Sequence, residues 1–134
     1  QQLAVIRAMV AQRGIDTRIQ PVPTVREPDG LAMSSRNRFL DADARARAAS
    51  LFRALQASNN ARTAGAAEDV MRRILLEAGL DVDYAVIRDA ATLRPVPADE
   101  PRRSAAPRRA LIAARVGGVR LIDNADWSGE PGGG

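Results

Sequence analysis

The spacing of hydrophobic residues predicts a helix followed by a strand at the start of the chain. Apolar residues recur at helical spacing from Leu3 to Val10, and Gly14 stands where a helix C-terminal glycine is typical. From Ile15 to Val22 the pattern changes to a period of two, which predicts a strand that ends at prolines. A helix that leads directly into a strand is typical of an α/β layer.

The next part of the chain predicts a tight turn and a long helix. Glu27-Pro-Asp-Gly30 combines a proline that presets φ with a glycine that tolerates positive φ. Asp41 or Asp43 can cap a helix that runs to about Ala61. The buried stripe of this helix is expected to consist of Ala44, Ala48, Leu51, Phe52 and Leu55.

A second helix and a small antiparallel sheet are predicted next. The apolar face of the helix spans residues 67–78, and Gly79 ends it. From Asp81 the hydrophobic period is two, with Val82, Tyr84 and Val86 alternating against Asp83, Ala85 and Ile87.

The rest of the sheet follows a proline-rich loop over residues 90–109. Two further strands, 111–116 and 119–122, are joined by Gly117-Gly118, which is a strong hairpin signal.

These elements predict two structural parts and a tail. Residues 1–40 are expected to be the end of an α/β domain, and residues 41–126 a compact α+β unit of two helices and a three-stranded antiparallel sheet. Residues 127–134 are expected to be a disordered tail. Because a forty-residue α/β piece cannot close its own core, and because the chain begins at Gln1 without Met, we expect further sequence upstream.

The composition excludes several kinds of chemistry. All twenty basic residues are arginine, and lysine, histidine and cysteine are absent. The chain therefore offers no thiol or amine nucleophile, no ordinary general base near neutral pH, and no disulfide. No zinc site of the usual kind can form, and we expect no protein-ligated metal. The lack of a long apolar run and of a signal peptide predicts no membrane partner and a cytoplasmic location.

The net charge of +4 and the recurring arginine pairs raise the possibility of nucleic-acid binding. Acidic residues are interleaved with the arginines, however, and aromatic residues for base stacking are scarce. We therefore expect no nucleic-acid partner. The arginine cluster at 102–109 is expected to be a mobile surface feature.

The sequence Met33-Ser-Ser-Arg36 has the chemistry of a phosphate-binding loop. Its two hydroxyls and the local backbone N–H groups can donate to phosphate oxygens, and Arg36 adds a permanently charged bidentate fork. Taken alone, this short motif is weak evidence, and a solvated loop before a helix is the favoured interpretation. Arg26 and Arg38 flank it, and a structural or solvated role is favoured for each over phosphate binding.

The longer segment around this motif carries a family signature. Val22-Pro-Thr-Val-Arg-Glu-Pro-Asp-Gly-Leu-Ala-Met-Ser-Ser-Arg-Asn-Arg-Phe-Leu40 closely resembles the signature of the pantoate–β-alanine ligases. Residues 82–89 and 113–124 resemble the same family, and Gln1-Gln2-Leu3 is similar to the point just after that family's Lys-Asp-aromatic motif. The resemblance covers nearly the whole chain but only the C-terminal half or so of a family member.

The resemblance implies a reaction, a fold and an assembly. The family condenses pantoate with β-alanine, using ATP and Mg²⁺, through a pantoyl-adenylate intermediate that releases pyrophosphate and then AMP. The fold would be the end of a Rossmann-like nucleotidyltransferase domain followed by a small α+β lid, and the parent protein a homodimer.

The resemblance also implies roles for individual residues. Met33, Ser34, Ser35 and Arg36 would bind ATP, with Ser34 and Arg36 on its phosphates as the catalytic pair. Val25 would line the adenine pocket through its backbone, and Gln2 would hydrogen-bond pantoate. The family's paired histidines and its Lys-Asp pair would lie upstream, so this chain alone is expected to be inactive. The alternative is a non-catalytic basic module, either an isolated lid or a nucleic-acid-binding fragment.

Overall fold

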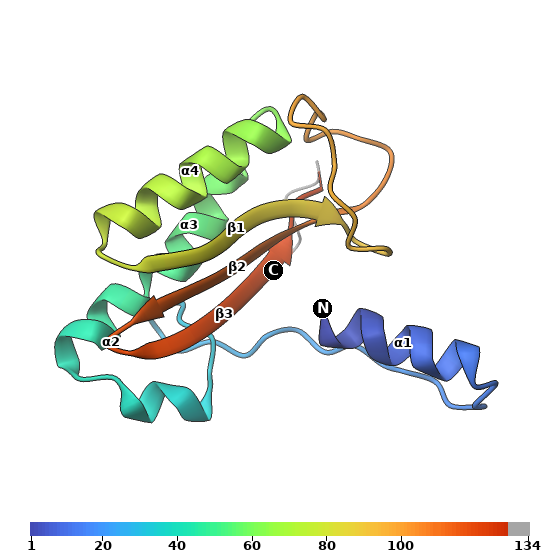
Figure 1. Cartoon of the computed structure of the whole chain (residues 1–134), viewed down its shortest axis with the longest axis horizontal. Helices are drawn as coiled ribbons and strands as arrows, with labels where there is room; N and C mark the ends of the chain where they lie inside the picture. The colour runs from blue at the N-terminus through green and yellow to red at the C-terminus, as the bar shows by residue number, and fades with distance from the viewer. Residues whose placement is uncertain (129–134) are drawn as a thin grey trace.

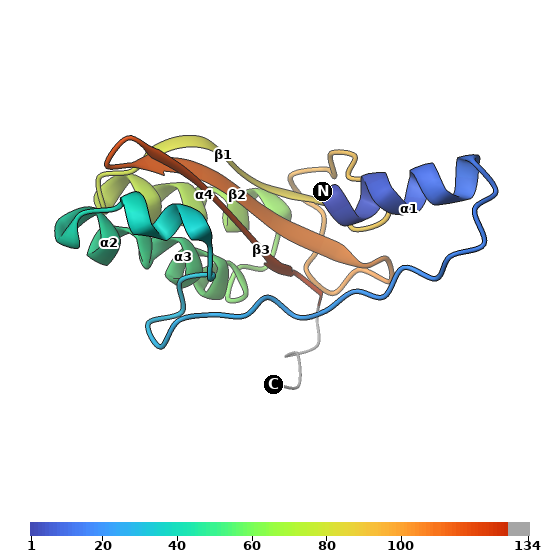
Figure 2. The same cartoon turned by 90° about the horizontal axis from the view of Figure 1, so that it is seen from below.

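The computed structural model describes residues 1–128, which form a helical layer packed on one three-stranded sheet, with a separate N-terminal helix (Figures 1 and 2). The sheet is antiparallel with strand order β1-β2-β3. In chain order the elements are α1 (Gln2–Gln12), the 3-10 helix η1 (Ser35–Phe39), α2 (Ala42–Ala48), α3 (Ser50–Ser58), α4 (Ala64–Glu77), β1 (Asp81–Asp89), β2 (Arg108–Val116) and β3 (Val119–Asp126). The predicted α+β unit of helices followed by a three-stranded sheet is thereby confirmed.

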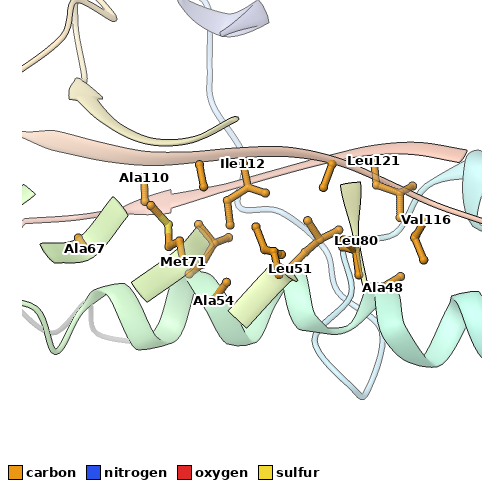
Figure 3. Packing of buried hydrophobic residues seen from close by; sticks show 14 of the residues in the cluster. Ala48, Leu51, Ala54, Ala67, Met71, Leu80, Ala110, Ile112, Val116 and Leu121 are labelled. Carbon is orange, nitrogen blue, oxygen red and sulfur yellow. The ribbon is translucent and has the colours of Figure 1, made fainter. Parts of the chain in front are cut away.

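The core lies between α3, α4 and one face of the sheet (Figure 3). Its side chains are small or aliphatic, as the scarcity of aromatic residues requires. The fully buried members include Leu51, Leu55, Met71, Leu75, Ile87 and Ile112. Burying each such side chain contributes about 1.5–3 kcal/mol, so this layer is the main source of stability.

Side-chain caps fix the beginnings of two of the helices. The Asp41 carboxylate accepts a hydrogen bond from the backbone N–H of Ala44 at 2.8 Å, which confirms the predicted cap. The Thr63 hydroxyl accepts from the N–H of Ala66 at the start of α4. Both caps satisfy backbone donors that have no partner within the helix.

The single long helix predicted from Asp41 to Ala61 is wrong, because the structure divides it into α2 and α3 at Ala49. Ala49 has ψ −16°, well away from the value of about −42° typical of an α-helix. The bend lets α2 reach the end of the hairpin, where a Cβ on Gly117 would lie 2.7 Å from the Cβ of Ala44. The helix α3 then continues beneath the centre of the sheet.

The strand predicted from Ile15 to Val22 is also wrong. This segment is extended, but it pairs with no strand among residues 1–128. Alternation gives a segment the side-chain pattern of a strand, whereas the ladder itself needs a neighbouring backbone to bond. The preceding helix α1 forms as predicted, and its apolar residues Val5 and Met9 stay exposed by 61% and 44%.

The sheet confirms the predicted hairpin and reveals a bulge that the sequence did not show. Gly117 and Gly118 have φ of +55° and +75°, as the two-residue turn requires. In β1 the register shifts between Val82 and Tyr84, so the core face carries Val82 before the bulge and Ala85 after it. The simple alternation predicted for β1 therefore fails at Asp83.

Trp127 was placed in the disordered tail, and this prediction is wrong for that residue. Its side chain is fully buried, and its indole N–H donates to the carbonyl of Ser58 at 2.9 Å. A buried indole that finds an acceptor contributes both apolar area and a satisfied donor. Residues 129–134 of the predicted tail lie outside the described part of the chain.

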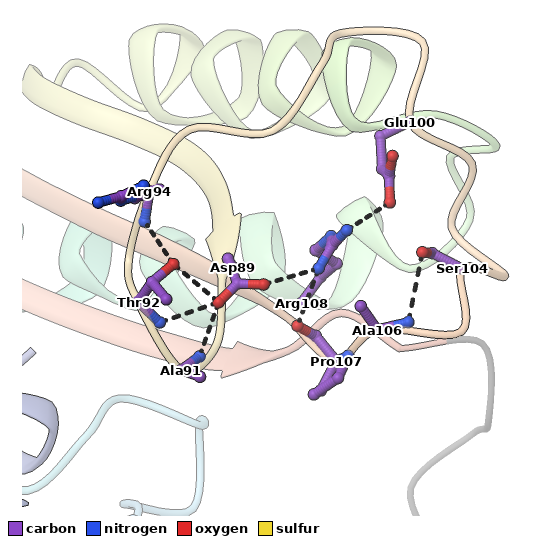
Figure 4. A network of polar contacts seen from close by, with 9 residues as sticks. All are labelled: Asp89, Ala91, Thr92, Arg94, Glu100, Ser104, Ala106, Pro107 and Arg108. Carbon is purple, nitrogen blue, oxygen red and sulfur yellow. Dashed lines mark hydrogen bonds and ion pairs between the residues drawn. The ribbon is translucent and has the colours of Figure 1, made fainter.

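Arg108 organises the long loop between β1 and β2 (Figure 4). Its guanidinium donates to Asp89 at 2.9 Å and to Glu100 at 2.6 Å, and its side chain is only 12% exposed. Asp89 also accepts from the backbone N–H and the hydroxyl of Thr92. The expectation of a mobile arginine cluster is thus wrong for Arg108, which is held by two carboxylates.

These contacts lower the pKa of both carboxyls. The backbone and hydroxyl of Thr92, and then Arg108, hold the pKa of Asp89 below its usual value. The Ser104 hydroxyl and Arg108 also lower the pKa of Glu100.

Among residues 1–128, no helix has the length and apolar content needed to cross a bilayer.

Acid is therefore expected to weaken the loop. Because both folded-state pKa values are lowered, the stabilisation is complete above the unfolded pKa of about 4 and is lost as the pH falls through the lower folded values. The double variant Asp89→Asn/Glu100→Gln should be less stable in urea than the unaltered chain at pH 6. This difference should shrink as the pH is lowered toward 2.5. An equal difference at both pH values would contradict the proposed linkage.

Candidate functional site

One cavity of about 450 Å³ lies where the N-terminal helix, the 31–37 loop and β3 meet. Its size falls within the range usual for small-molecule sites. Four of the residues singled out from the sequence line it, namely Gln2, Met33, Ser34 and Arg36. The remaining lining residues are Leu31, Ala32, Asn37, Leu51, Arg120, Leu121, Ile122 and Asp123. Val25 and Ser35, which the sequence also singled out, are outside the lining.

Backbone hydrogen bonds give the 25–37 segment its shape. The N–H of Met33 donates to the carbonyl of Val25 at 3.0 Å, and the N–H of Glu27 donates to the carbonyl of Leu31 at 2.8 Å. Between them, the predicted turn closes with a bond from Gly30 N–H to Glu27 carbonyl. The segment is therefore a short folded-back loop that presents Met33 and Ser34 at its end.

Ser34 and Arg36 are positioned by the start of η1. The Ser34 hydroxyl oxygen accepts from the N–H of Arg36 at 3.2 Å, which leaves the hydroxyl hydrogen free to donate. The Asn37 amide nitrogen donates to the carbonyl of Ala32 at 3.1 Å and braces the loop. Arg36 is exposed, and no carboxylate within residues 1–128 pairs with it. The loop thus offers one hydroxyl donor and one uncompensated cation to the cavity.

Arg26 attaches this loop to the sheet. Its guanidinium donates to both carboxylate oxygens of Asp123, at 2.7 and 3.0 Å, and to the carbonyl of Gly30 at 3.0 Å. The guanidinium also lies over the ring of Phe52, 4.3 Å from its centroid. The Asp123 side chain is 1% exposed, so this is a nearly buried bidentate ion pair. These contacts support a structural role for Arg26, which the sequence favoured over phosphate binding.

The turn that carries Gly30 is packed as closely as the core. Gly30 has φ +90°, and a Cβ at this position would lie 2.0 Å from Cδ1 of Phe52. The adjacent Leu31 is 2% exposed and belongs to the main hydrophobic cluster. Asp29 is held by Arg45, whose hydrogen bond lowers the pKa of that carboxyl. The turn at residues 29–31 therefore packs against the helices and the core of the C-terminal unit. The domain boundary predicted at residue 40 stays a prediction.

The described residues offer no magnesium site of their own. No group of three or more acidic residues that could hold a metal ion occurs among residues 1–128. Asp123 is the only carboxylate in the cavity lining, and both of its oxygens bind Arg26. Mg²⁺ prefers oxygen ligands and is often bound largely through substrate phosphates. The residues of this chain therefore do not fit a protein-ligated Mg²⁺.

The sequence did not single out Asp123 or Arg120 as parts of a site. The strand predicted over 119–122 stops before Asp123, whereas β3 continues to Asp126 and Asp123 is buried within it. Both residues lie within 113–124, a stretch that the family resemblance includes. Because the predicted strand ends before Asp123, its alternation gave no signal that this carboxylate is buried.

Comparison with known proteins gives a consistent result. The chain is 49% identical over 127 residues to the pantothenate synthetase of Mycolicibacterium smegmatis, covering 92% of this chain and 38% of that protein. It is 43% identical over 137 residues to the pantothenate synthetase of Magnetococcus marinus, covering 98% and 45%. The chain thus spans less than half the length of these curated relatives.

Solved structures agree with this comparison. The pantothenate synthetase of Thermus thermophilus superposes with a TM-score of 0.86 at 36% identity, covering 95% of this chain and 46% of that one. The pantoate–β-alanine ligase of Francisella tularensis, solved with β-γ ATP and β-alanine, gives 0.64 at 25% identity, covering 94% and 40%.

The fold, helices packed on a three-stranded antiparallel sheet, and these neighbours define the class as the C-terminal portion of a pantothenate synthetase-like protein. A family model for pantoate–β-alanine ligase matches residues 1–126. The chain therefore belongs to the pantoate–β-alanine ligase family.

Removing the guanidinium of Arg26 should strongly destabilise the fold. Arg26→Ala leaves the buried carboxylate of Asp123 unpaired, which is expected to lower the free energy of unfolding by about 3 kcal/mol. Arg26→Ala/Asp123→Asn should lose less than the sum of the two single variants. Asp43→Asn, which weakens an exposed pair with Arg47 and leaves the bond from Arg47 to the Gly79 carbonyl, should cost about 0.5 kcal/mol. Denaturant titration measures all four variants, and additive losses would contradict the coupling.

The glycine of the turn provides a second test of this packing. Gly30→Ala brings both a strained φ and a clash with Phe52, whereas Gly118→Ala brings a strained φ alone, since nothing lies within 4 Å of its Cβ. Gly30→Ala should therefore lose about 1–3 kcal/mol more of unfolding free energy than Gly118→Ala. Equal losses in denaturant titration would show that the Phe52 contact is unimportant.

Proposed function

We propose that this chain is the C-terminal part of an ATP-dependent ligase that condenses pantoate with β-alanine. The reaction would pass through pantoyl adenylate and release pyrophosphate and AMP. The observation that carries the proposal is the cavity in which Ser34 and Arg36 of the signature loop meet Gln2 of α1. The names of the relatives, and the ATP and β-alanine in the Francisella tularensis structure, support the same reaction.

The residues at the cavity have the chemistry that adenylation requires. As pantoate's carboxylate attacks the α-phosphate, negative charge grows on the departing pyrophosphate. Arg36 provides a fixed cationic fork for that charge, and the Ser34 hydroxyl donates a further hydrogen bond. No side-chain base is needed for this step, because a carboxylate is already ionised near pH 7. The absence of histidine and lysine from this chain is therefore compatible with these roles.

Other residues would hold the substrates in place. Gln2 would hydrogen-bond pantoate, since its side chain lines the cavity from α1. Met33 and Ser35 would contact ATP beside Ser34, and the backbone of Val25 would border the adenine. The carbonyl of Val25 accepts from Met33, and its N–H and the second lone pair of its carbonyl are the backbone groups that could bond the base. Mg²⁺ would enter bound to the phosphates of ATP.

The chain alone is proposed to lack useful ligase activity. It spans 38–46% of the length of the relatives described above, and the family's paired histidines and Lys-Asp pair are absent from its sequence. The complete protein is proposed to be a cytoplasmic homodimer, as the family resemblance implies. A purely basic binding module has less support, because many of the arginines are neutralised by neighbouring carboxylates.

Arg36→Ala is the direct test of the proposal in the intact ligase that carries this sequence. It should reduce kcat/KM for ATP by roughly 10²–10³-fold, equivalent to about 2–4 kcal/mol of transition-state stabilisation. Arg38→Ala is the matched control, because Arg38 lies on the same 3-10 helix but stacks on Phe39 outside the cavity lining. The rate of pyrophosphate release measures the activity of both variants. Unchanged turnover in Arg36→Ala would refute the assigned role.

A further inference from the structure

A second arginine faces the cavity from a different element. Arg120 lies near the start of β3, whereas Arg36 lies in η1, and both line the same space. The side chain of Arg120 is 43% exposed, so its guanidinium is accessible. The only carboxylate in the lining, Asp123, is already neutralised by Arg26. The cavity therefore presents two arginines from two elements and no unpaired anion.

The position of Arg120 is unfavourable for the sheet. In the β2–β3 register Arg120 lies directly opposite Arg115. Like charges at directly opposite positions of an antiparallel pair destabilise it. The sheet tolerates this pairing because a carboxylate of β1, Asp83, forms an ion pair with each arginine.

The bulge in β1 places one carboxylate against both arginines. Asp83 lies at the register shift between Val82 and Tyr84, and its Oδ2 accepts a hydrogen bond from Nε of Arg120. Its Oδ1 lies 3.7 Å from Nε of Arg115. Arg120 is thus anchored by Asp83 through Nε, with the Tyr84 hydroxyl as a second neighbour, and the N–H groups of its terminal nitrogens are the donors that it can offer to an anion in the cavity.

We propose that Arg120 is a second phosphate-binding residue of this site, which holds the pyrophosphate portion of ATP together with Arg36. Asp83 is then a positioning residue that orients Arg120 toward the cavity. This inference rests on the proposed function, because it assigns a further contact to the same nucleotide. Two cationic forks from separate elements suit an anion with two phosphorus atoms better than one with a single phosphorus atom.

The test is a titration of the isotope-labelled 134-residue chain with inorganic pyrophosphate at low ionic strength, followed by NMR of the arginine Nε–H groups. The Nε–H signals of Arg36 and Arg120 should shift with one shared dissociation constant. The signal of Arg115 should shift much less, although Arg115 lies beside the same Asp83. Orthophosphate should bind more weakly than pyrophosphate. This measurement requires no substitution, so it does not depend on the folding of a variant.

Variants extend the test to affinity. Arg120→Gln should weaken pyrophosphate binding about tenfold, the effect of one lost charged donor, and Arg120→Lys should restore part of it. Arg115→Gln, the matched control, should change the affinity by less than about twofold. Asp83→Asn should weaken binding less than Arg120→Gln, since it disturbs only the orientation of Arg120.

The outcomes separate this inference from the proposed function. If Arg36→Gln weakens binding while Arg120→Gln has no effect, the role of Arg120 is refuted and the Arg36 assignment stands. If only Arg120→Gln weakens binding, the assignment of Arg36 fails instead. Absence of pyrophosphate binding by the unaltered chain would overturn the inference outright, because both arginines belong to this chain.

Discussion

The bidentate ion pair between Arg26 and Asp123 joins the two parts of the chain from which the cavity is built. Asp123 belongs to the last strand, and Arg26 to the loop that presents Ser34 and Arg36, ninety-seven positions earlier. The pair is nearly buried, it is covered by Phe52, and it also fixes the carbonyl of Gly30. A buried pair of this kind keeps one geometry because any departure would leave an uncompensated charge. The orientation of the loop toward β3 therefore follows from this interaction, and with it the approach of Arg36 to Arg120.

Local signals in the sequence predicted the local structure, while interactions between distant segments decided the rest. The Asp41 cap, the turn at Gly30 and the Gly117-Gly118 hairpin depend on a few adjacent residues, and each formed as expected. The strand at 15–22 failed because pairing needs a neighbour that its own sequence does not specify. The break at Ala49 depends on how α2 meets the hairpin, which no periodicity in the helix reveals.

In the candidate site, too, the sequence revealed the residues that are adjacent in the chain but not those that folding brings together. The motif at 33–36 was recognisable because its residues are contiguous, and the cavity unites three of them with Gln2. Arg120 and Asp123 belong to a strand whose alternation of apolar and charged residues is ordinary, so only the folded arrangement shows that they reach the same cavity. The sequence thus identifies the loop through the longer signature over residues 22–40, but the opposite wall requires the sheet register.

The chain order of these elements has a consequence for synthesis. The signature loop is synthesised before its anchor, Asp123, which follows Arg26 by ninety-seven positions and lies in β3. Contacts of such long sequence separation carry a large loop-closure entropy, which slows their formation. During translation the loop is therefore complete in sequence but not yet held in shape until β3 has emerged and paired with β2. The wall of the candidate site that joins this loop to β3 can therefore form only after β3 has been synthesised.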